Sequence, residues 1–280
     1  MSAAVHPAGS AALSVWAEGV ALWTPRLPGW PAARAVLRGE TQPQGEPAPR
    51  PQPALLPPTE RRRAPDTVAV ALEVAFAACA SAGRDPARLP SVFASAYGDL
   101  PLNDYMCATL ARTPLLVSPT RFHNSVHNAA AGYWTIATGC FEPYTALSAR
   151  EHTFGAGLLS AATQAVSEDA AVLYVAYDIE ACGPMATMVS SRGLFGVAMV
   201  LSPQPSTRAV ARLVCEVRAG PAPRNSAASA QAAALVQGNA MAGCLCVFEA
   251  LAQEVPRELM QTLSGGLALS VAIVPRGPVA

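Results

Sequence analysis

Three of the four histidines lie close together in the sequence, His123 and His127 in FHNSVHNAAAG and His152 in SAREHTFGAG. Imidazole is the side chain that most often serves as a general acid or base near neutral pH. A base needs a nucleophile to activate, and the chain has no G-x-S-x-G turn that would present a serine. The histidines alone therefore do not establish an active site.

The seven cysteines are scattered among apolar neighbours, and only Cys244 and Cys246 lie close together, as C-x-C. Zinc sites need two such pairs, or a pair followed by histidines, and neither follows here. No glycine-rich loop of the dinucleotide or P-loop type is present. We therefore expect free, mostly buried thiols and neither a metal nor a cofactor.

Composition narrows the class of protein further. Hydrophobic residues make up 51% of the 280 positions, and 19 basic side chains balance 19 acidic ones. A neutral chain is a poor candidate for binding nucleic acid. The N-terminus lacks the pattern of a signal peptide, and no run is long and apolar enough for a membrane span. We expect a cytoplasmic protein that forms a single domain over residues 1–280.

Hydrophobic periodicity and turn residues predict the elements that must position these side chains. Strands are predicted at 12–23, 91–98, 144–149, 170–178, 193–203, 208–218 and 266–275, and helices at 30–37, 64–83, 103–112, 128–139, 152–166 and 226–252. Residues 41–60 carry seven prolines, which predicts a surface loop. The alternation of strands and helices predicts an α/β fold with helices on a mainly parallel sheet.

The segment SPTRFHNSVHNAAAGYWTIATGCFEPYTALSA resembles part of the β-ketoacyl synthases, and the upstream TERRRAPDTVAVALEVAF extends the resemblance to roughly residues 58–202. The positions that match in order are Asn128, Ala131, Gly132, Thr135, Ile136, Gly139 and Pro143. The chain is most similar to short ketosynthase-like, chain-length-factor-like proteins of aryl polyene gene sets. This resemblance implies a thiolase-like layered α/β/α fold, an N-terminal half with a truncated C-terminal part that leaves an apolar layer exposed.

The catalytic residues of that family are missing. Counting from Pro143 places Glu151 at the turn where a synthase has its cysteine, and a glutamate cannot form the acyl thioester. The family also brings two histidines and a lysine from its C-terminal half, whereas this chain has no histidine after His152 and no lysine at all. The resemblance therefore implies a protein that does not condense acyl groups.

Polar residues at the start of helix 128–139 have a structural explanation. Ser125, His127 and Asn128 precede that helix, and short polar side chains there can cap the free amides and orient the helix. We favour this role over general-base chemistry for His127. Within the helix, Tyr133 and Trp134 add large apolar surface, which is more typical of a core than of an interface.

Glu151 and His152 are the weak candidates for residual chemistry, although a polar pair lining a degenerate pocket is the simpler interpretation. A carboxylate at Glu151 would suit the positive end of the following helix. The resemblance places Phe154 and Leu158 near the tunnel for the acyl chain. Nothing in these residues points to an enzyme that acts alone.

The run Arg61, Arg62 and Arg63 is either the solvated start of a helix or a docking patch for an acidic acyl carrier protein. The favoured hypothesis is a non-condensing subunit that pairs with an active β-ketoacyl synthase as a heterodimer and shapes its acyl pocket. Two alternatives remain open: an acyl-thioester decarboxylase or hydrolase that uses Glu151 and His152, and a scaffold that binds acyl carrier protein.

Overall fold

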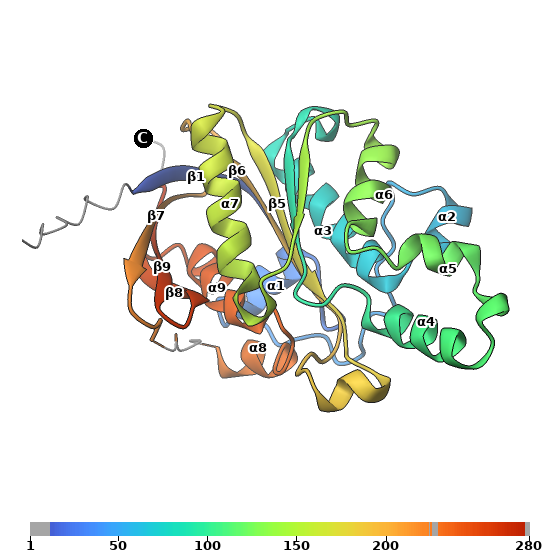
Figure 1. The fold of residues 1–280 in the computed structure, drawn as a ribbon. Coiled ribbons are helices and arrows are strands. Elements are labelled where there is room, and N and C mark those ends of the chain that lie inside the picture. Colours follow the sequence, from blue (N-terminus) through green and yellow to red (C-terminus); the bar gives the residue numbers. More distant parts are fainter. Residues whose placement is uncertain (1–11, 224, 226–228, 278–280) are drawn as a thin grey trace, which may run out of the picture.

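The computed structural model describes residues 12–223, 225 and 229–277. Within them, one sheet of nine strands has the order β4-β3-β5-β6-β1-β7-β9-β8, and β2 pairs with β1 (Figure 1). The strands are β1 (Leu13–Thr24), β2 (Leu27–Pro28), β3 (Ser91–Ala94), β4 (Tyr144–Leu147), β5 (Val172–Asp178), β6 (Phe195–Ser202), β7 (Ala211–Ala219), β8 (Arg257–Ser264) and β9 (Leu267–Pro275).

The strand directions differ from the prediction. Only β3 is parallel to its neighbours, β4 and β5. The other pairs are antiparallel, among them β5 with β6, β6 with β1, and β7 with β9. The expectation of a mainly parallel sheet is wrong because most strands are buried on both faces here, and such strands have the continuous apolar sequences that usually indicate parallel pairing.

Helices cover both faces of the sheet and make the predicted α/β/α layers. They are α1 (Trp30–Leu37), α2 (Pro58–Arg63), α3 (Asp66–Ala82), α4 (Leu100–Arg112), α5 (Pro119–Asn124), α6 (Ala129–Thr138), α7 (Thr153–Ser167), α8 (Ala230–Leu235) and α9 (Leu245–Gln253). One hydrophobic cluster joins α3 and α6 to one face, and a second joins α1, α7 and α9 to the other. Trp134 is fully buried in the first cluster, as predicted.

The long helix α3 packs unusually close to the sheet. It ends at Gly83, whose left-handed φ of 63° closes the helix. A Cβ atom at Gly19 in β1 would lie 2.0 Å from the carbonyl oxygen of Ala78, so only glycine allows this approach of strand and helix. Ala-rich positions on α3 serve the same purpose, which explains why a helix with little amphipathic character is buried almost all round.

The C-terminal residues complete this domain. β9 pairs with β7 along its length. β8 pairs with the other side of β9 and also contacts α7. The short C-terminal part therefore packs against α7 among the described residues. The strand β8 was not predicted, because its sequence RELMQTLS is largely polar.

Two further predictions are corrected or refined. Residues 226–228 of the helix predicted at 226–252 lie outside the described residues, and the rest is divided into α8 and α9 by a turn around Gly238, whose φ is 82°. Residues 41–57 form an irregular segment, and α2 begins at Pro58, inside the loop that was predicted at 41–60. This segment is fastened at Arg50, whose Nε lies 2.6 Å from Asp66 Oδ1. No helix in the described part of the chain is long and apolar enough to cross a membrane.

Candidate functional site

The turn between β4 and α7 has the shape of a strand–turn–helix elbow. Arg150 adopts a left-handed φ of 52°, a conformation that costs energy for a residue with a side chain. The buried hydroxyl of Thr153 stabilises it, because it accepts from the amide of Ala149 at 2.9 Å and donates to the carbonyl of Arg150 at 2.6 Å. Ser148 fastens the strand end by donating to Ala96 O at 2.8 Å. These hydrogen bonds hold the turn that contains Glu151.

Glu151 and His152 are poorly arranged for acid–base chemistry. The Glu151 side chain is 64% exposed, and its Oε1 lies 3.8 Å from Nε2 of His152. A backbone hydrogen bond, followed by the charges of His152 and Arg150, lowers the pKa of Glu151. A carboxylate with a lowered pKa is a weak base and is not protonated near neutral pH, so it suits neither role. The structure brings the two residues together without forming a catalytic pair.

A hollow of about 300 Å³ lies beside this elbow. Glu151, Phe154 and Gly155 form one wall, the turn before α9 forms another, and β8 closes the third. The ring of Phe154 lines the hollow and packs against the buried rings of Tyr174 and Phe248, with centroids 5.6 Å and 6.4 Å away. Leu158, one turn further along α7, is fully buried in the core cluster and does not line the hollow.

The cysteines offer no activated thiol near the elbow. Cys79, Cys140, Cys215, Cys244 and Cys246 are buried and Cys107 is exposed. Burial raises the pKa of Cys79 and of Cys215 to about 12, and it also raises the pKa values of Cys244 and Cys246. These groups stay protonated near neutral pH, and a thiol is a poor nucleophile. Among the described residues, no three potential ligands gather into a metal site.

The predicted capping residues of α6 do something else. Asn128 occupies the cap position without a side-chain cap, and its Nδ2 instead donates to the hydroxyl of Tyr144 at 3.0 Å. Nε2 of His127 lies 2.9 Å from Ser95 O, and the Ser125 hydroxyl donates to Phe122 O at 2.8 Å. The capping role is therefore corrected: the side chains of Asn128 and His127 are used in contacts with Tyr144 and Ser95, which connect α6 to the ends of β4 and β3.

A buried polar network that was not predicted from the sequence is connected to the turn between β4 and α7 through Ala96, which contacts both Asp178 and Ser148. Asp178, at the end of β5, accepts from the amides of Ala96 and Tyr97 at 2.7 and 3.3 Å and from the Ser95 hydroxyl at 3.2 Å. The Nδ2 of Asn239 donates to the carbonyls of Arg192 and Gly193 and lies 3.4 Å from Asp178 O. The only sequence signal was the Gly238–Asn239 pair inside an Ala-rich run.

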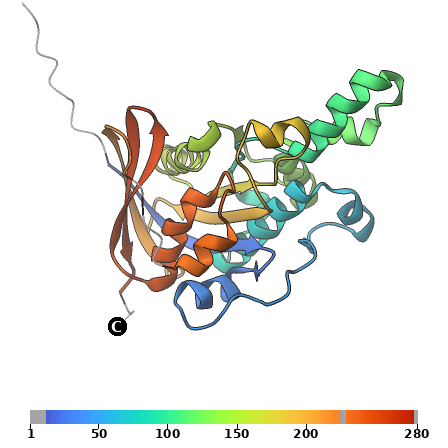
Figure 2. The same cartoon turned by 90° about the horizontal axis from the view of Figure 1, so that it is seen from below.

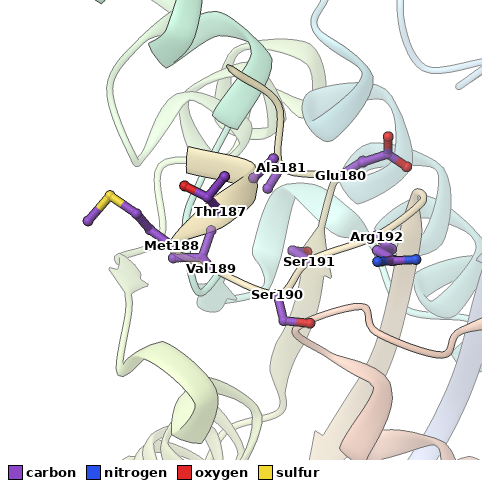
Figure 3. Close-up of a pocket in the computed structure, with 9 residues that line it drawn as sticks. Glu180, Ala181, Thr187, Met188, Val189, Ser190, Ser191 and Arg192 are labelled. Atoms are coloured by element: carbon purple, nitrogen blue, oxygen red, sulfur yellow. The ribbon is translucent and has the colours of Figure 1, made fainter. Parts of the chain in front are cut away.

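A second hollow, of about 490 Å³, lies within the loop that joins β5 to β6. Figure 3 shows that this single loop supplies its labelled lining, from Glu180 to Arg192. Its polar groups are used within the loop, since Glu180 accepts from the Gly193 amide and Ala181 donates to Ser191 O. No residue predicted from the sequence lies there, and we assign no chemistry to it.

Exposed apolar side chains gather in one part of the molecule. Eight of the 15 large hydrophobic residues that are exposed in the described chain fall between positions 110 and 144. They are Leu110, Leu115, Leu116, Phe122, Val126, Ile136, Phe141 and Tyr144, which we call the apolar face. Leu115, Phe141 and Ile136 are 98%, 99% and 82% exposed. A monomer rarely exposes such a concentration, so this face indicates an interaction site.

The apolar face adjoins an open edge of the sheet. β4 ends the strand order, and its other neighbour is missing among the described residues. Ser91 donates to Pro143 O and Ser95 to Leu147 O, so alternate residues, Tyr144 and Ala146, direct their backbone groups outward. A groove of about 820 Å³ lies nearby between α6 and the segment before α2, and Gly132 lines it. In Figure 2, α4 and α5 project away from the body of the domain.

The three arginines at the end of α2 are not equivalent. The Nη2 of Arg61 donates to Leu56 O at 2.8 Å, which holds this side chain against its own chain. Arg62 and Arg63 are exposed. If this run forms a positive patch, which was the alternative to a solvated helix start, the patch consists mainly of these two residues.

Comparison with known proteins agrees with these features. Residues 31–260 match the family described as beta-ketoacyl synthase, N-terminal domain. A comparison with curated proteins finds no match. One similar structure is the ketosynthase ApeO in complex with its chain length factor ApeC from Xenorhabdus doucetiae, with a TM-score of 0.70 and 18% identity over 93% of this chain and 99% of that chain.

Two other structures are similar to the same degree. The ishigamide ketosynthase/chain length factor has a TM-score of 0.70 and 14% identity, and it covers 95% of this chain and 100% of that chain. The AntDE:AntF complex, a type II polyketide synthase acyl-carrier protein with its ketosynthase bound to a hexaketide, has the same TM-score and coverage at 10% identity. A ketosynthase from the bacillaene synthase is covered over only 76% of its length. This chain belongs to the β-ketoacyl synthase N-terminal domain family and has its thiolase-like fold.

Proposed function

We propose that this chain is a non-condensing, ketosynthase-like subunit that pairs with an active β-ketoacyl synthase in type II fatty acid or polyketide biosynthesis. In this role it resembles a chain-length factor and shapes the pocket for the growing acyl chain, in an aryl polyene type of system and in the cytoplasm. The observation that supports the proposal is Glu151 in the turn between β4 and α7, at the position where the resemblance places the nucleophilic cysteine of the family.

The apolar face supports a permanent partner. Obligate interfaces are large and apolar, on the order of 2,000 Å² or more in total. The exposed residues of α5, α6 and β4, the adjoining groove and the outward backbone groups of β4 together offer both apolar area and strand pairing. Two similar structures are described as complexes of a ketosynthase with a chain length factor, which makes a ketosynthase the partner of choice.

Acyl carrier protein is proposed as a second, transient partner. Arg62 and Arg63 lie exposed at the end of α2, beside Arg61, and could meet an acidic protein surface. A structure of a related type II system is described as containing a carrier protein. A chain that only holds carrier protein would bind it without any effect on product length, which separates the scaffold alternative from the favoured role.

The enzyme alternative has no observation in its favour. The exposure and lowered pKa of Glu151 and its separation from His152 are those of a solvated pair. We therefore expect that incubation of the chain with a mass-tagged acyl carrier protein leaves its intact mass unchanged. A stable acyl adduct on any cysteine or on Glu151 would contradict the proposal. The partner ketosynthase, incubated in parallel, serves as the positive control because it should acquire the acyl mass.

The decisive experiment alters the hollow beside the elbow. Phe154→Leu should open its inner end toward Tyr174 and Phe248, so that the complex with the ketosynthase makes longer products. A milder change than alanine is chosen because truncating a buried aromatic to alanine costs about 3–5 kcal/mol. Product chain length is measured by mass spectrometry on co-expressed complexes that elute as heterodimers. Leu158→Val, a similarly mild change at the buried position one turn further along α7, tests whether the pocket continues past Phe154.

Phe93→Leu is the matched control for that experiment. Phe93 is also a buried aromatic residue, but it packs against Trp134 on the opposite face of the sheet. It should reduce stability to a similar degree and leave the product length unchanged. If the Phe154 and Leu158 variants form intact complexes whose products have the normal length, the pocket-shaping role is wrong and the scaffold alternative gains support.

A further inference from the structure

Two walls of the hollow beside the elbow come from segments that are far apart in the sequence. One wall is the start of α7 with Glu151, Phe154 and Gly155, and the other is the turn before α9, between Ala240 and Cys244. Neither wall is a strand, so the hydrogen bonds of the sheet do not fix the distance between them. The width of the hollow therefore depends on the contacts that fasten each segment to the rest of the domain.

The side chain of Asn239 fastens the second wall. This residue directly precedes the turn and is 5% exposed. Its Oδ1 accepts from the amide of Met241 at 2.9 Å, a contact within the turn. Its Nδ2 lies 3.0 and 3.3 Å from the carbonyl oxygens of Arg192 and Gly193, and 3.4 Å from that of Asp178. One amide group therefore connects the turn to the end of β5 and to the residues before β6.

The end of β5 is also connected to the first wall. The carboxylate of Asp178 accepts from the amide of Ala96 at 2.7 Å, and the carbonyl of Ala96 accepts from the hydroxyl of Ser148 at 2.8 Å. Ser148 directly follows β4, in the loop that leads to Glu151. The carboxyl ends of β3, β4 and β5 meet the start of β6 at this edge of the sheet. Asp178 thus connects to one wall through its side chain and to the other through its carbonyl.

These contacts lie in the interior of the domain. Asp178 is fully buried and Asn239 nearly so, and a buried carbonyl that loses its donor is costly. The turn cannot move away from β5 without leaving such groups unpaired. Binding sites need supporting contacts of this kind to hold their walls within about 0.5 Å of the required positions.

We propose that Asn239 is a positioning residue that sets the width of the hollow and, through it, the length of acyl chain that the hollow accepts. Asn239 does not line the hollow and acts through its neighbours Ala240 and Met241, which do. The inference rests on the proposed function, because it takes the hollow as the place where the acyl chain is measured. Without the Nδ2 contacts the turn shifts more freely, and chains of more than one length fit.

Asn239→Ser separates the two sets of contacts. A serine hydroxyl can still accept from the amide of Met241, two residues later, but it is too short to reach the carbonyls beside β5 and β6. Labelling of the isolated chain with N-ethylmaleimide measures how often the hollow opens at Cys244, a buried residue of its lining. Cys215, buried in β7 between β1 and β9, reports the opening of the whole domain. We expect the labelling rate of Cys244 relative to that of Cys215, determined by peptide mass spectrometry, to increase roughly tenfold.

Ser202→Ala is the matched control for the labelling. Ser202 is also buried and donates from its side chain to a backbone carbonyl, that of Gln204 at 2.9 Å, but it lies at the other end of β6. This variant should leave the ratio of the two labelling rates unchanged. If Asn239→Ser raises the labelling of both cysteines equally, or does not raise that of Cys244, Asn239 does not hold the hollow and the proposal is wrong.

Product length in the co-expressed complex with the ketosynthase is the second measurement. Asn239→Ser complexes that elute as heterodimers should make products spread over more chain lengths than those of the wild type. Products of unchanged length from a hollow that opens more often would overturn the role of Asn239 in selecting the chain. If Phe154→Leu alters product length and Asn239→Ser does not, this inference fails while the proposed function stands; if neither alters it, both fail.

Discussion

Gly132→Trp is expected to weaken assembly with a ketosynthase by about 5- to 150-fold while the isolated chain folds normally. A Cβ atom at Gly132 would meet nothing within 4 Å, because the residue faces the open groove beside α6. Replacing a glycine inside a helix also removes an unfavourable residue, so the helix itself should not suffer. In a close-packed interface, by contrast, a large side chain costs about 1–3 kcal/mol or more, which is roughly a 5- to 150-fold loss of affinity.

The measurement has two parts. Thermal unfolding of the isolated variant should match that of the wild type, and size-exclusion chromatography after co-expression should show separate subunits instead of a heterodimer. Gly266→Trp is the matched control, because Gly266 also has open space around it but lies in the turn between β8 and β9. A Gly132→Trp variant that still forms the complex would mean that the partner covers a different face.

The sequence alone could not make this distinction at Gly132. A small residue in an apolar helix predicts close packing, but it does not say whether the neighbour is the same chain or another. The structure separates the two sides of α6: Trp134 is buried in the core, while Ile136 is exposed beside the groove. Only the placement of α6 at the margin of the domain reveals which side is open.

The fold was predictable where local signals are strong. The helices at 66–82, 129–138 and 153–167 begin and end within two residues of their predicted bounds, because glycine, proline or polar residues mark their ends. Strand direction was not predictable, since a strand that is buried on both faces has the same apolar sequence in either direction. The division of the predicted C-terminal helix depends on Gly238, and a single glycine is often tolerated in a helix.

The candidate site was predicted only where it depends on local spacing in the sequence, and not where it depends on contacts made in the folded chain. The position of Glu151 followed from its spacing after Pro143, which the strand–turn–helix connection keeps constant. The hydroxyl of Thr153 that closes the elbow could not be inferred, because its contacts depend on the left-handed turn at Arg150. The role of the Asp178 carboxylate could not be predicted from the sequence either, because its hydrogen-bond donors lie more than eighty positions earlier in the chain.

Asp178 should make the stability of the protein depend strongly on pH. Burial raises the pKa of this carboxyl from 3.8 to about 7, against the opposing effect of the hydrogen bonds from Ala96, Tyr97 and Ser95. The folded state therefore binds the proton more tightly than the unfolded state. The resulting stabilisation is fully present below pH 3.8 and is lost as the pH rises through about 7.

The expected change in the free energy of unfolding follows from the pKa shift of Asp178. Each pKa unit corresponds to about 1.4 kcal/mol, so the free energy of unfolding should fall by about 2 kcal/mol between about pH 5.5 and pH 8. Urea titrations at these two pH values measure it. In Asp178→Asn the difference should be much smaller, although the variant is less stable at low pH because an amide oxygen replaces only one of two acceptors. Glu168→Gln, at an exposed carboxylate, should retain the wild-type difference.

The ionisation of Asp178 should also affect the turn that contains Glu151, because a short series of hydrogen bonds connects the two. Asp178 accepts from the Ala96 amide, and the carbonyl of Ala96 accepts from the Ser148 hydroxyl at the end of β4. Because the buried carboxylate is poorly solvated once it is ionised, ionisation of Asp178 should favour local opening of the strand ends near Glu151 before it unfolds the domain. The protection factors of the amides at residues 95–98, which are corrected for the pH dependence of intrinsic exchange, should therefore fall above about pH 7 in the wild type. Protection that falls equally in Asp178→Asn would show that some other group controls these loops.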